Sequence, residues 1–222
     1  MLENIPKVTR NLLIINVLMF IGTLLNEEVM IRYFALFYPT SPYFHWWQYL
    51  THMFMHGGWW HIIFNMYALF IFGSVVERII GEKKFLILYF VCGLGAAALH
   101  TGVEYLQATG YMNEIAKGSQ VAMQNYTILK STPTVGASGA IYGLLIAYAM
   151  LFPEAKLTLI FPPVTLSAKW WVIIFAVIEL VTGVTGVAAG LAHFAHLGGM
   201  LFGFLLIWYW RKKVTLFRKS SY

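Results

Sequence analysis

The sequence contains no aspartate, and only 11% of its 222 residues carry a charge. A soluble domain of this length would carry about 25% charged residues. Hydrophobic residues make up 59% of the chain, and its mean hydropathy is +0.69. The shortage of charge therefore excludes an ordinary soluble domain and indicates a membrane protein.

Cysteine is nearly absent as well. The single cysteine, Cys92, lies inside an apolar run, so no intramolecular disulfide can form. We interpret Cys92 as a small packing residue. No internal repeat, low-complexity tract or second soluble domain is visible, and we expect one membrane domain over residues 1–222 with short tails.

Long apolar runs are what the sequence has in abundance. Runs of roughly 18 residues or more are typical of membrane-spanning helices. Six are present, at about 11–31, 59–77, 84–103, 134–152, 170–187 and 189–210. The first is too long for a signal-peptide core and no small-residue cleavage site follows it, so we keep it as a helix. The sequence predicts an all-α, polytopic bundle of six transmembrane helices.

The positive charge has a one-sided distribution. Twelve of the fifteen cations fall in the N-terminus, the loops after the second and fourth runs, and the C-terminus, which leaves Arg32, Lys117 and Lys130 for the other side. Because positive loops stay cytoplasmic, both termini are predicted to lie inside. The net charge of +6 thus indicates a lipid bilayer as partner and no nucleic acid. The short N-terminus without a transit peptide favours a prokaryotic inner membrane.

This topology brings polar side chains to one depth near the outer side. Ser138 lies about five residues into the fourth run and His196 about seven into the sixth, roughly 7–10 Å below the outer helix ends. His61 and Asn65 fall in the first two turns of the second run. Three helices thus contribute polar groups to one shallow layer.

Small residues indicate which helices touch. Gly139 and Gly143 form GxxxG in the fourth run, and Ala195, Gly199 and Gly203 form a longer ladder in the sixth. Such faces let backbones approach closely in lipid. We therefore expect the fourth and sixth helices to meet at Ser138 and His196. In the alternative, GxxxG only joins helices and Ser138 bonds a backbone carbonyl.

A serine and a histidine in contact favour nucleophilic catalysis. Ser138 would be the nucleophile and His196 its base. The usual third member is a carboxylate, but eight of the nine glutamates lie in tails, loops or helix ends, and only Glu179 is mid-helix. We predict a dyad, with Glu179 in a hydrogen-bonded structural role; a functional acid is the alternative. His61 and Asn65, at i and i+4, are positioned to stabilise an oxyanion.

Metal binding is the competing chemistry. Five of the seven histidines stand in two groups along the chain, at His52, His56, His61, His193 and His196. The sequence has no HExxH, no paired carboxylates and no second cysteine. We expect no metal and no cofactor, with haem ligation between helices as the alternative. His45 and His100 are interpreted as structural.

Three motifs resemble those of the rhomboid family of intramembrane serine proteases, over nearly the whole chain. "HMFMHGGWWHIIFN" is similar to the family's helix-two signature, with His61 and Asn65 on the oxyanion side. "GASGAIYG" resembles the GxSG nucleophile motif, with Ser138 as nucleophile and Tyr142 as the tyrosine that stacks on the base. "AHLGGMLFG" fits AHxxGxxxG, with His196 as base.

The resemblance implies a serine endopeptidase that cleaves single-span membrane proteins in or near their transmembrane segments. An inactive relative that binds transmembrane clients is the alternative. By the resemblance, Gly136 supports the oxyanion site, the loop 32–58 lies half-submerged beside the bundle, and the fifth helix, with Trp170 and Trp171, is the lateral substrate gate.

The chain departs from the family pattern in two places. Gln48 stands where family members often have arginine after tryptophan, so an arginine network is expected to be missing. The loop 104–132 is longer than a minimal rhomboid needs, and the sequence assigns it no role. The sequence also sets no oligomeric state.

Overall fold

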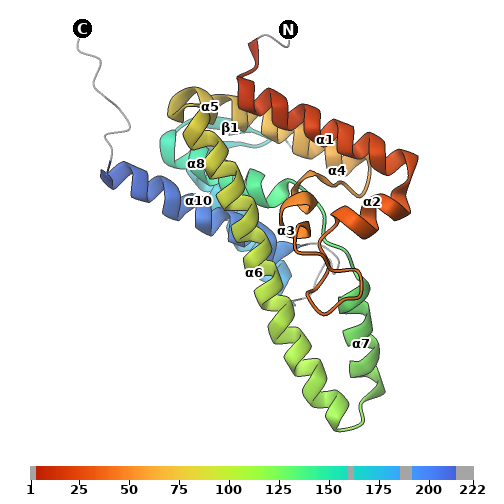
Figure 1. Ribbon diagram of the computed structural model, residues 1–222. Helices are drawn as coiled ribbons and strands as arrows, with labels where there is room; N and C mark the ends of the chain where they lie inside the picture. Colours follow the sequence, from red (N-terminus) through yellow and green to blue (C-terminus); the bar gives the residue numbers. More distant parts are fainter. Residues whose placement is uncertain (1–3, 160–162, 186–191, 214–222) are drawn as a thin grey trace, which may run out of the picture.

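The structure, a computed structural model, describes residues 4–159, 163–185 and 192–213, and most of these are helical (Figure 1). The elements are α1 (Lys7–Leu25), α2 (Glu27–Phe34), α3 (Gln48–Thr51), η2 (His52–Phe54), α4 (Trp59–Ala68), η3 (Leu69–Gly73), α5 (Ser74–Ile80), α6 (Glu82–Ala116), α7 (Gln120–Ser131), α8 (Ser138–Leu151), β1 (Lys156–Thr158), β2 (Thr165–Ser167), α9 (Ala168–Thr185) and α10 (His193–Lys213). The strands β1 and β2 pair antiparallel, with Lys156 opposite Ser167.

Helical segments stand at each of the six expected runs. Within the described ranges, four are long and apolar enough to cross a membrane: α1, the continuous stretch Trp59–Ile80, α6 and α9. The shorter apolar helix α8 has 14 residues and α10 has 21. Residues 186–187 of the fifth expected run and 189–191 of the sixth lie outside the described residues. The protein is a polytopic all-α membrane protein, as predicted.

The first spanning helix is shorter than its apolar run. α1 ends at Leu25, whereas the sequence suggested about residue 31. The side chain of Asn26 accepts a hydrogen bond of 3.2 Å from the backbone N–H of Val29, which makes Asn26 the N-cap of α2. An asparagine side chain in this position favours a new helix start over continuation of the old helix.

The other end of α1 is fixed by Glu77 of α5, an acid that the sequence suggested lies at a helix end. Its carboxylate is buried and accepts hydrogen bonds from the backbone N–H of Val8 at 2.9 Å and of Thr9 at 2.7 Å. The hydroxyl of Thr9 donates a third bond of 2.7 Å. A carboxylate at a helix N-terminus satisfies free N–H groups and complements the helix dipole. Glu77 thereby ties α1 to α5.

The predicted close approach of the fourth and sixth helices is confirmed. A Cβ atom built at Gly199 of α10 would lie 1.8 Å from the carbonyl oxygen of Gly139 in α8. One built at Gly203 would lie 2.7 Å from the carbonyl oxygen of Gly143. The backbones of α8 and α10 are therefore in direct contact, as small residues permit. α6 completes this core, because Cys92 packs against Gly143.

The stretch 104–132, expected as a loop, is instead a helical hairpin. α6 continues to Ala116, and α7 returns from Gln120 to Ser131. The turn between them has Gly118 at φ 89° and Ser119 as N-cap of α7, with the hydroxyl accepting from Ala122 N–H at 3.2 Å. Figure 1 shows this hairpin projecting away from the bundle.

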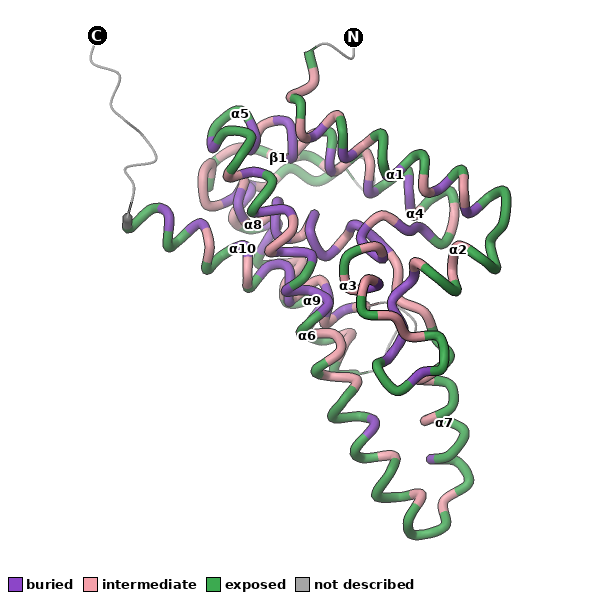
Figure 2. The backbone as a smooth tube through the Cα atoms, viewed as in Figure 1, coloured by how far each residue is buried: buried purple, intermediate pink, exposed green. Residues whose placement is uncertain are grey.

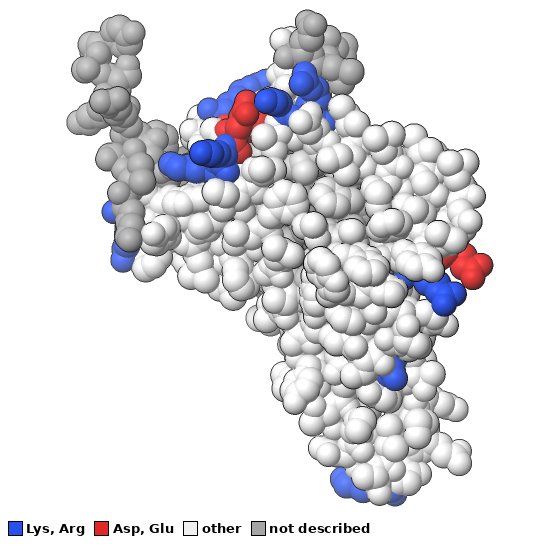
Figure 3. All heavy atoms as spheres, in the orientation of Figure 1, with Lys and Arg blue, Asp and Glu red and all other residues white. Residues whose placement is uncertain are grey.

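Burial and charge divide the molecule along its length. Figure 2 shows buried residues gathered where α6, α8 and α10 meet, and a mostly exposed hairpin. On the face visible in Figure 3, Lys and Arg gather at the end where α1 begins. A few charged side chains lie at the right-hand edge and farther down toward the opposite end, and an uncharged zone separates them from the first group. An uncharged zone flanked by charge is what a protein embedded in a bilayer requires.

Candidate active site

Ser138 is the first residue of α8, whereas the sequence suggested a place about five residues inside a helix. The segment before it is extended: Thr134 exchanges two backbone hydrogen bonds with Leu36, and Gly136 N–H donates to the carbonyl of His52 at 2.9 Å. Gly136 has φ 135°, a conformation that residues with a side chain rarely adopt. This backbone cannot be helical, so α8 begins only after it.

Ser138 and His196 are in hydrogen-bond contact. The Oγ atom of Ser138 lies 2.8 Å from Nε2 of His196, which is the fourth residue of α10. The ring of Tyr142, one turn along α8, stacks on the imidazole with 4.3 Å between centroids and 7° between planes. The structure thus joins the serine hydroxyl to an imidazole, whereas the alternative interpretation paired it with a backbone carbonyl.

His61 and Asn65 lie beside this pair on α4. The Nδ1 atom of His61 accepts from Gly57 N–H at 3.4 Å, so the ring hydrogen is assigned to Nε2. A Cβ atom at Gly136 would lie 2.9 Å from that Nε2 and 3.4 Å from Ser138 Oγ. Asn65 is buried and lines the same cavity. Both side chains therefore bring hydrogen-bond donors toward the space next to the serine.

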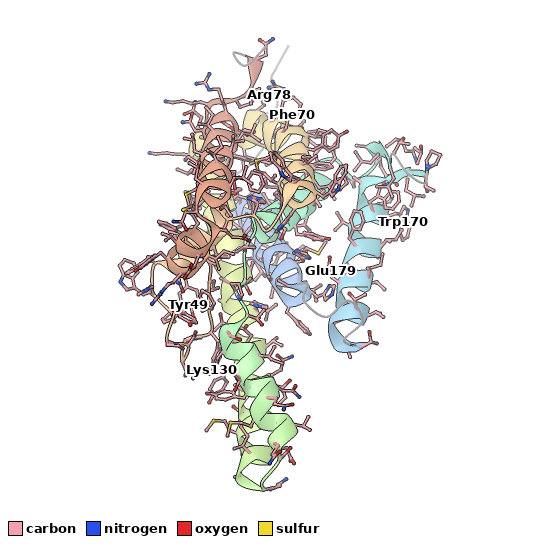
Figure 4. All side chains as sticks on the ribbon, turned by 90° about the vertical axis from the view of Figure 1, so that its right-hand side faces the viewer. Tyr49, Phe70, Arg78, Lys130, Trp170 and Glu179 are labelled. Atoms are coloured by element: carbon pink, nitrogen blue, oxygen red, sulfur yellow. The ribbon has the colours of Figure 1, made fainter. Side chains whose placement is uncertain are left out.

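The sequence missed the partner of Glu179. This side chain of α9 lies between α9 and α10 (Figure 4) and is only 7% exposed. Its Oε1 lies 2.9 Å from Nδ1 of His196 and accepts the hydroxyl of Tyr142 at 2.6 Å. Its Oε2 lies 2.6 Å from Nδ1 of His193. The hydrogen-bonded role expected for Glu179 is observed, and one of its contacts is with the imidazole of the expected Ser138–His196 pair.

A cavity of about 760 Å³ opens onto the pair. Its floor includes Ser138, His196 and Asn65, and its far wall is the α6–α7 hairpin, with Glu104, Tyr111 and Asn125 among the lining residues. The stretch to which the sequence assigned no role therefore forms part of the candidate active site. Its volume is within the range typical of ligand-binding pockets.

Two further histidines are buried behind the site. His52 donates from Nδ1 to the carbonyl of Gln48 at 2.9 Å, and burial lowers its pKa to about 4. His56 is 1% exposed and its ring lies 5.0 Å from that of His61. Burial, together with the neighbouring His61, lowers the pKa of His56 to about 3. Both rings are therefore neutral at pH 7 and act as packing groups.

His100 and His45 have contacts that the sequence did not suggest. Nε2 of His100 lies 2.9 Å from the hydroxyl of Thr134 and so helps to hold the extended segment that precedes α8. His45 stacks on Trp47, with 4.4 Å between ring centroids, in the loop before α3. Both contacts agree with the structural role expected for these residues.

The five histidines considered as a metal cluster are not gathered around one point. Across residues 4–159, 163–185 and 192–213, no group of three or more His, Cys, Asp or Glu is arranged to hold a metal ion. His193 and His196 instead share the carboxylate of Glu179. The geometry fits hydrogen-bond chemistry better than metal ligation.

The side chain of Gln48 stabilises the loop 32–58 through hydrogen bonds to its backbone. Its side chain is fully buried and its Oε1 accepts from the backbone N–H of Phe37 at 3.4 Å and of His45 at 3.1 Å. Its amide donates to the carbonyls of Arg32 at 3.1 Å and Tyr43 at 2.9 Å. A neutral amide thus satisfies four backbone groups. The loop is held together without a buried arginine at position 48.

The two tryptophans at the start of α9 differ in environment. Trp171 is buried, stacks on Phe175 and donates from Nε1 to the carbonyl of Leu157 in β1 at 2.9 Å. Trp170 is 52% exposed and points away from the bundle (Figure 4). One tryptophan therefore anchors the first turn of α9 to the strand hairpin.

Fold and site together define a class: a polytopic membrane protein in which a serine at the start of one helix meets a histidine of another inside the bundle. Residues 43–213 match the family model described as Rhomboid domain, which is well over half of the chain. The chain belongs to the rhomboid family.

Several curated proteins are similar to this chain. It is 28% identical to "Rhomboid protease AarA" of Providencia stuartii over 183 residues, which cover 82% of this chain and 62% of that protein. It is 34% identical to "Presenilin-associated rhomboid-like protein, mitochondrial" of Bos taurus over 191 residues, 82% of this chain and 42% of the relative. It is 31% identical to "Rhomboid protein 1, mitochondrial" of Saccharomyces cerevisiae over 167 residues, which cover 72% of this chain and 41% of that protein.

These relatives bear on the expected location of the protein. The chain spans between 41% and 62% of the length of the three. Because both mitochondrial and bacterial proteins are among them, they do not support the expected assignment to a prokaryotic membrane. What stands is that the protein is a multi-pass membrane protein of this family.

Proposed function

We propose that the protein is an intramembrane serine endopeptidase that hydrolyses peptide bonds in or near the transmembrane segments of membrane proteins. The observation that carries this is the 2.8 Å contact between Ser138 Oγ and His196 Nε2 at the floor of a cavity. A hydroxyl is a weak nucleophile unless an adjacent base takes its proton. Membership of a family that includes a protein named as a protease supports the proposal.

The reaction proceeds in two halves. Ser138 Oγ attacks the carbonyl carbon of the scissile peptide bond while His196 Nε2 takes the hydroxyl proton. The tetrahedral intermediate collapses, the C–N bond breaks, and His196 gives its proton to the leaving amine. Water then attacks the acyl-serine ester, His196 takes a proton from it, and breakage of the ester bond returns that proton to Ser138.

The oxyanion of each tetrahedral intermediate meets donors on the α4 side of the serine. His61 Nε2–H and the amide of Asn65 face this space, and Gly136 leaves it free of any side chain. The first backbone N–H groups of α8 lack intrahelical partners and add the positive end of the helix dipole. Losing one such donor costs about 100- to 1,000-fold in rate.

The substrates are single-span membrane proteins. A helical segment satisfies its own backbone groups, so it must unwind before a carbonyl reaches Ser138. Segments with small or helix-breaking residues near the scissile bond are therefore the preferred substrates. α9 is the lateral gate: its first turn is anchored through Trp171, while its outer part presents exposed Val177, Val181 and Val184.

Both termini lie in the cytoplasm, and the cavity opens toward the opposite side. Most of the cations lie at the start of α1, around the α5–α6 turn, in the strand hairpin, at the start of α9 and at the end of α10; they include Lys7, Arg78, Lys84 and Lys169. Positive segments remain on the cytoplasmic side. The α6–α7 hairpin, at the other end of α6, then projects from the outer face and supplies a wall of the cavity.

Labelling by a fluorophosphonate probe, together with cleavage of a single-span reporter in liposomes, tests this proposal. The wild-type protein is expected to bind the probe and cleave the reporter. Ser138→Ala and His196→Ala are expected to lose at least about 10⁴-fold in cleavage rate and all labelling. Ser131→Ala, which removes an exposed hydroxyl on α7, is the matched control and retains both.

Two results would contradict the proposal. One is a Ser138→Ala protein that still cleaves the reporter at the wild-type rate. The other is a folded wild-type protein that binds the reporter without cleaving it and is not labelled, which would instead favour an inactive relative that binds transmembrane clients.

A further inference from the structure

Glu179 is an unusual residue in its position. It is a buried acid in the middle of an apolar helix. Its Oε1 contacts residues of α8 and α10, and its Oε2 contacts a residue of α10. Buried acids within spanning segments are costly, so they are retained where they pair with other polar groups. Each of its three close contacts belongs to α8 or α10, the helices that also carry Ser138 and His196.

The contacts assign the hydrogen positions. An ionised carboxylate accepts hydrogen bonds and donates none. The hydrogens between Glu179 and its neighbours therefore come from the Tyr142 hydroxyl and from Nδ1 of His196 and His193. With its hydrogen on Nδ1, neutral His196 presents an unprotonated Nε2 to Ser138 Oγ, 2.8 Å away. That is the tautomer a general base needs.

We propose that Glu179 is a positioning residue that holds His196 in the Nδ1–H tautomer and thereby completes a Ser138–His196–Glu179 triad. The inference rests on the proposed function, because the tautomer matters only if His196 is a base. The carboxylate also stabilises the imidazolium that forms when His196 takes the serine proton. Glu179 itself exchanges no proton in this scheme.

Tyr142 and His193 keep the carboxylate in place. Tyr142 restrains both members of the His196–Glu179 contact. Its ring stacks on the imidazole of His196, and its hydroxyl donates to the same Oε1 of Glu179 that faces His196. His193 occupies the other oxygen, and its Nδ1 also lies 3.1 Å from the hydroxyl of Thr182. With both oxygens engaged, the carboxylate cannot rotate away from His196 without losing a hydrogen bond.

A protonated Glu179 makes the opposite prediction. Its hydroxyl would donate to one histidine Nδ1, and if that histidine is His196, the ring hydrogen moves to Nε2 and points at Ser138. His196 would then be unable to take the serine proton. The position of the hydrogen on His196 in the wild-type protein therefore decides between the two arrangements without any mutation.

The first experiment is ¹⁵N NMR of histidine-labelled protein in detergent micelles at pH 7.5. The His196 signals are identified as those missing from His196→Ala. We expect a protonated Nδ1 and an unprotonated Nε2 at His196. A hydrogen on Nε2 would overturn the proposal, whether or not the protein proves to be a protease.

The second experiment measures kcat and KM of Glu179→Leu, with active sites counted by probe labelling. Removal of the acceptor is expected to lower kcat by about 10³- to 10⁴-fold with KM within about threefold. Glu179→Gln, whose amide group can donate to Nδ1 and so place the ring hydrogen on Nε2, is expected to lower kcat by a similar factor. Glu154→Leu makes the same change at an exposed glutamate and retains wild-type kcat.

The outcomes separate the two proposals. A wild-type protein that is neither labelled nor active would refute the protease function, while the NMR result would still report on Glu179. An active wild type together with a folded Glu179→Leu protein of unchanged kcat would refute the triad alone. If Glu179→Leu does not fold, the wild-type tautomer and the kcat of Glu179→Gln decide.

Discussion

The contact between α8 and α10 makes Gly199 the position where the smallest substitution has the largest expected effect. The methyl group of Gly199→Ala would lie 1.8 Å from the carbonyl oxygen of Gly139 and 2.7 Å from its carbonyl carbon. Carbon and oxygen atoms in close contact stay about 3.3 Å apart or more. The two helices must therefore separate by about 1.5 Å at this point.

Such a separation acts directly on the candidate site. Ser138 is next to Gly139 on α8, and His196 is one turn before Gly199 on α10. The distance between Oγ and Nε2 is 2.8 Å, and a separation of this size would lengthen it beyond hydrogen-bond range. A misplacement of 1 Å can cost about 100-fold in rate. Overpacking also lowers the free energy of unfolding by about 1–3 kcal/mol.

Reporter cleavage in liposomes and thermal unfolding in detergent measure the two effects. We expect Gly199→Ala to lose at least about 100-fold in kcat/KM and to unfold at a lower temperature. The control is Gly110→Ala, the same change in α6 at a position where a Cβ meets nothing within 4 Å. It is expected to keep wild-type activity and to raise the free energy of unfolding by up to about 1 kcal/mol. A Gly199→Ala protein as active and stable as the wild type would show that α8 and α10 are not in backbone contact.

Two more predictions concern the segment before α4. Since burial lowers the pKa of His52 to about 4 and of His56 to about 3, the unfolded chain binds more protons below about pH 6.5. The contribution of the two histidines to the free energy of unfolding is complete above that pH and falls toward pH 4 by roughly 1.4 kcal/mol per pH unit for each histidine. The free energy of unfolding, measured in detergent between pH 7.5 and 5, is therefore expected to decrease more steeply below about pH 6.5. The decrease should be smaller in His56→Phe. Gln48→Arg should lower the unfolding temperature, because arginine accepts no hydrogen bond and would leave Phe37 and His45 N–H unsatisfied; an unchanged temperature would refute the role given to Gln48.

The helices and the serine–histidine contact could be predicted because each depends on a local pattern. Apolar runs locate spanning helices wherever they are long enough, as at Trp59–Ile80. The contact between Ser138 and His196 follows from small residues at a spacing of four in both helices, since only that spacing lets two backbones meet along one face. These features need no knowledge of distant neighbours.

The features that the sequence missed depend on partners far along the chain. α8 starts at Ser138 because the preceding residues bond Leu36 and His52, about a hundred residues upstream. Glu77 is buried at an end of α1, from which nearly seventy residues separate it. The sequence pattern suggests a loop at 104–132 because polar residues there interrupt the apolar pattern, although they do not lower helix propensity.

Two kinds of restraint hold the candidate site, and they come from different helices. Backbone contact at Gly199 sets the distance between Ser138 and His196, because no side chain separates α8 from α10. In the proposed triad, the hydrogen bond that His196 donates to Glu179 of α9 sets the orientation of the imidazole and the place of its hydrogen. An outward displacement of α9 would therefore remove the carboxylate and leave the distance unchanged. Substitution of Glu179 therefore alters the place of the hydrogen without moving α8 from α10, whereas separation of the two helices at Gly199 also moves Tyr142 away from His196, and both of these residues bond Glu179.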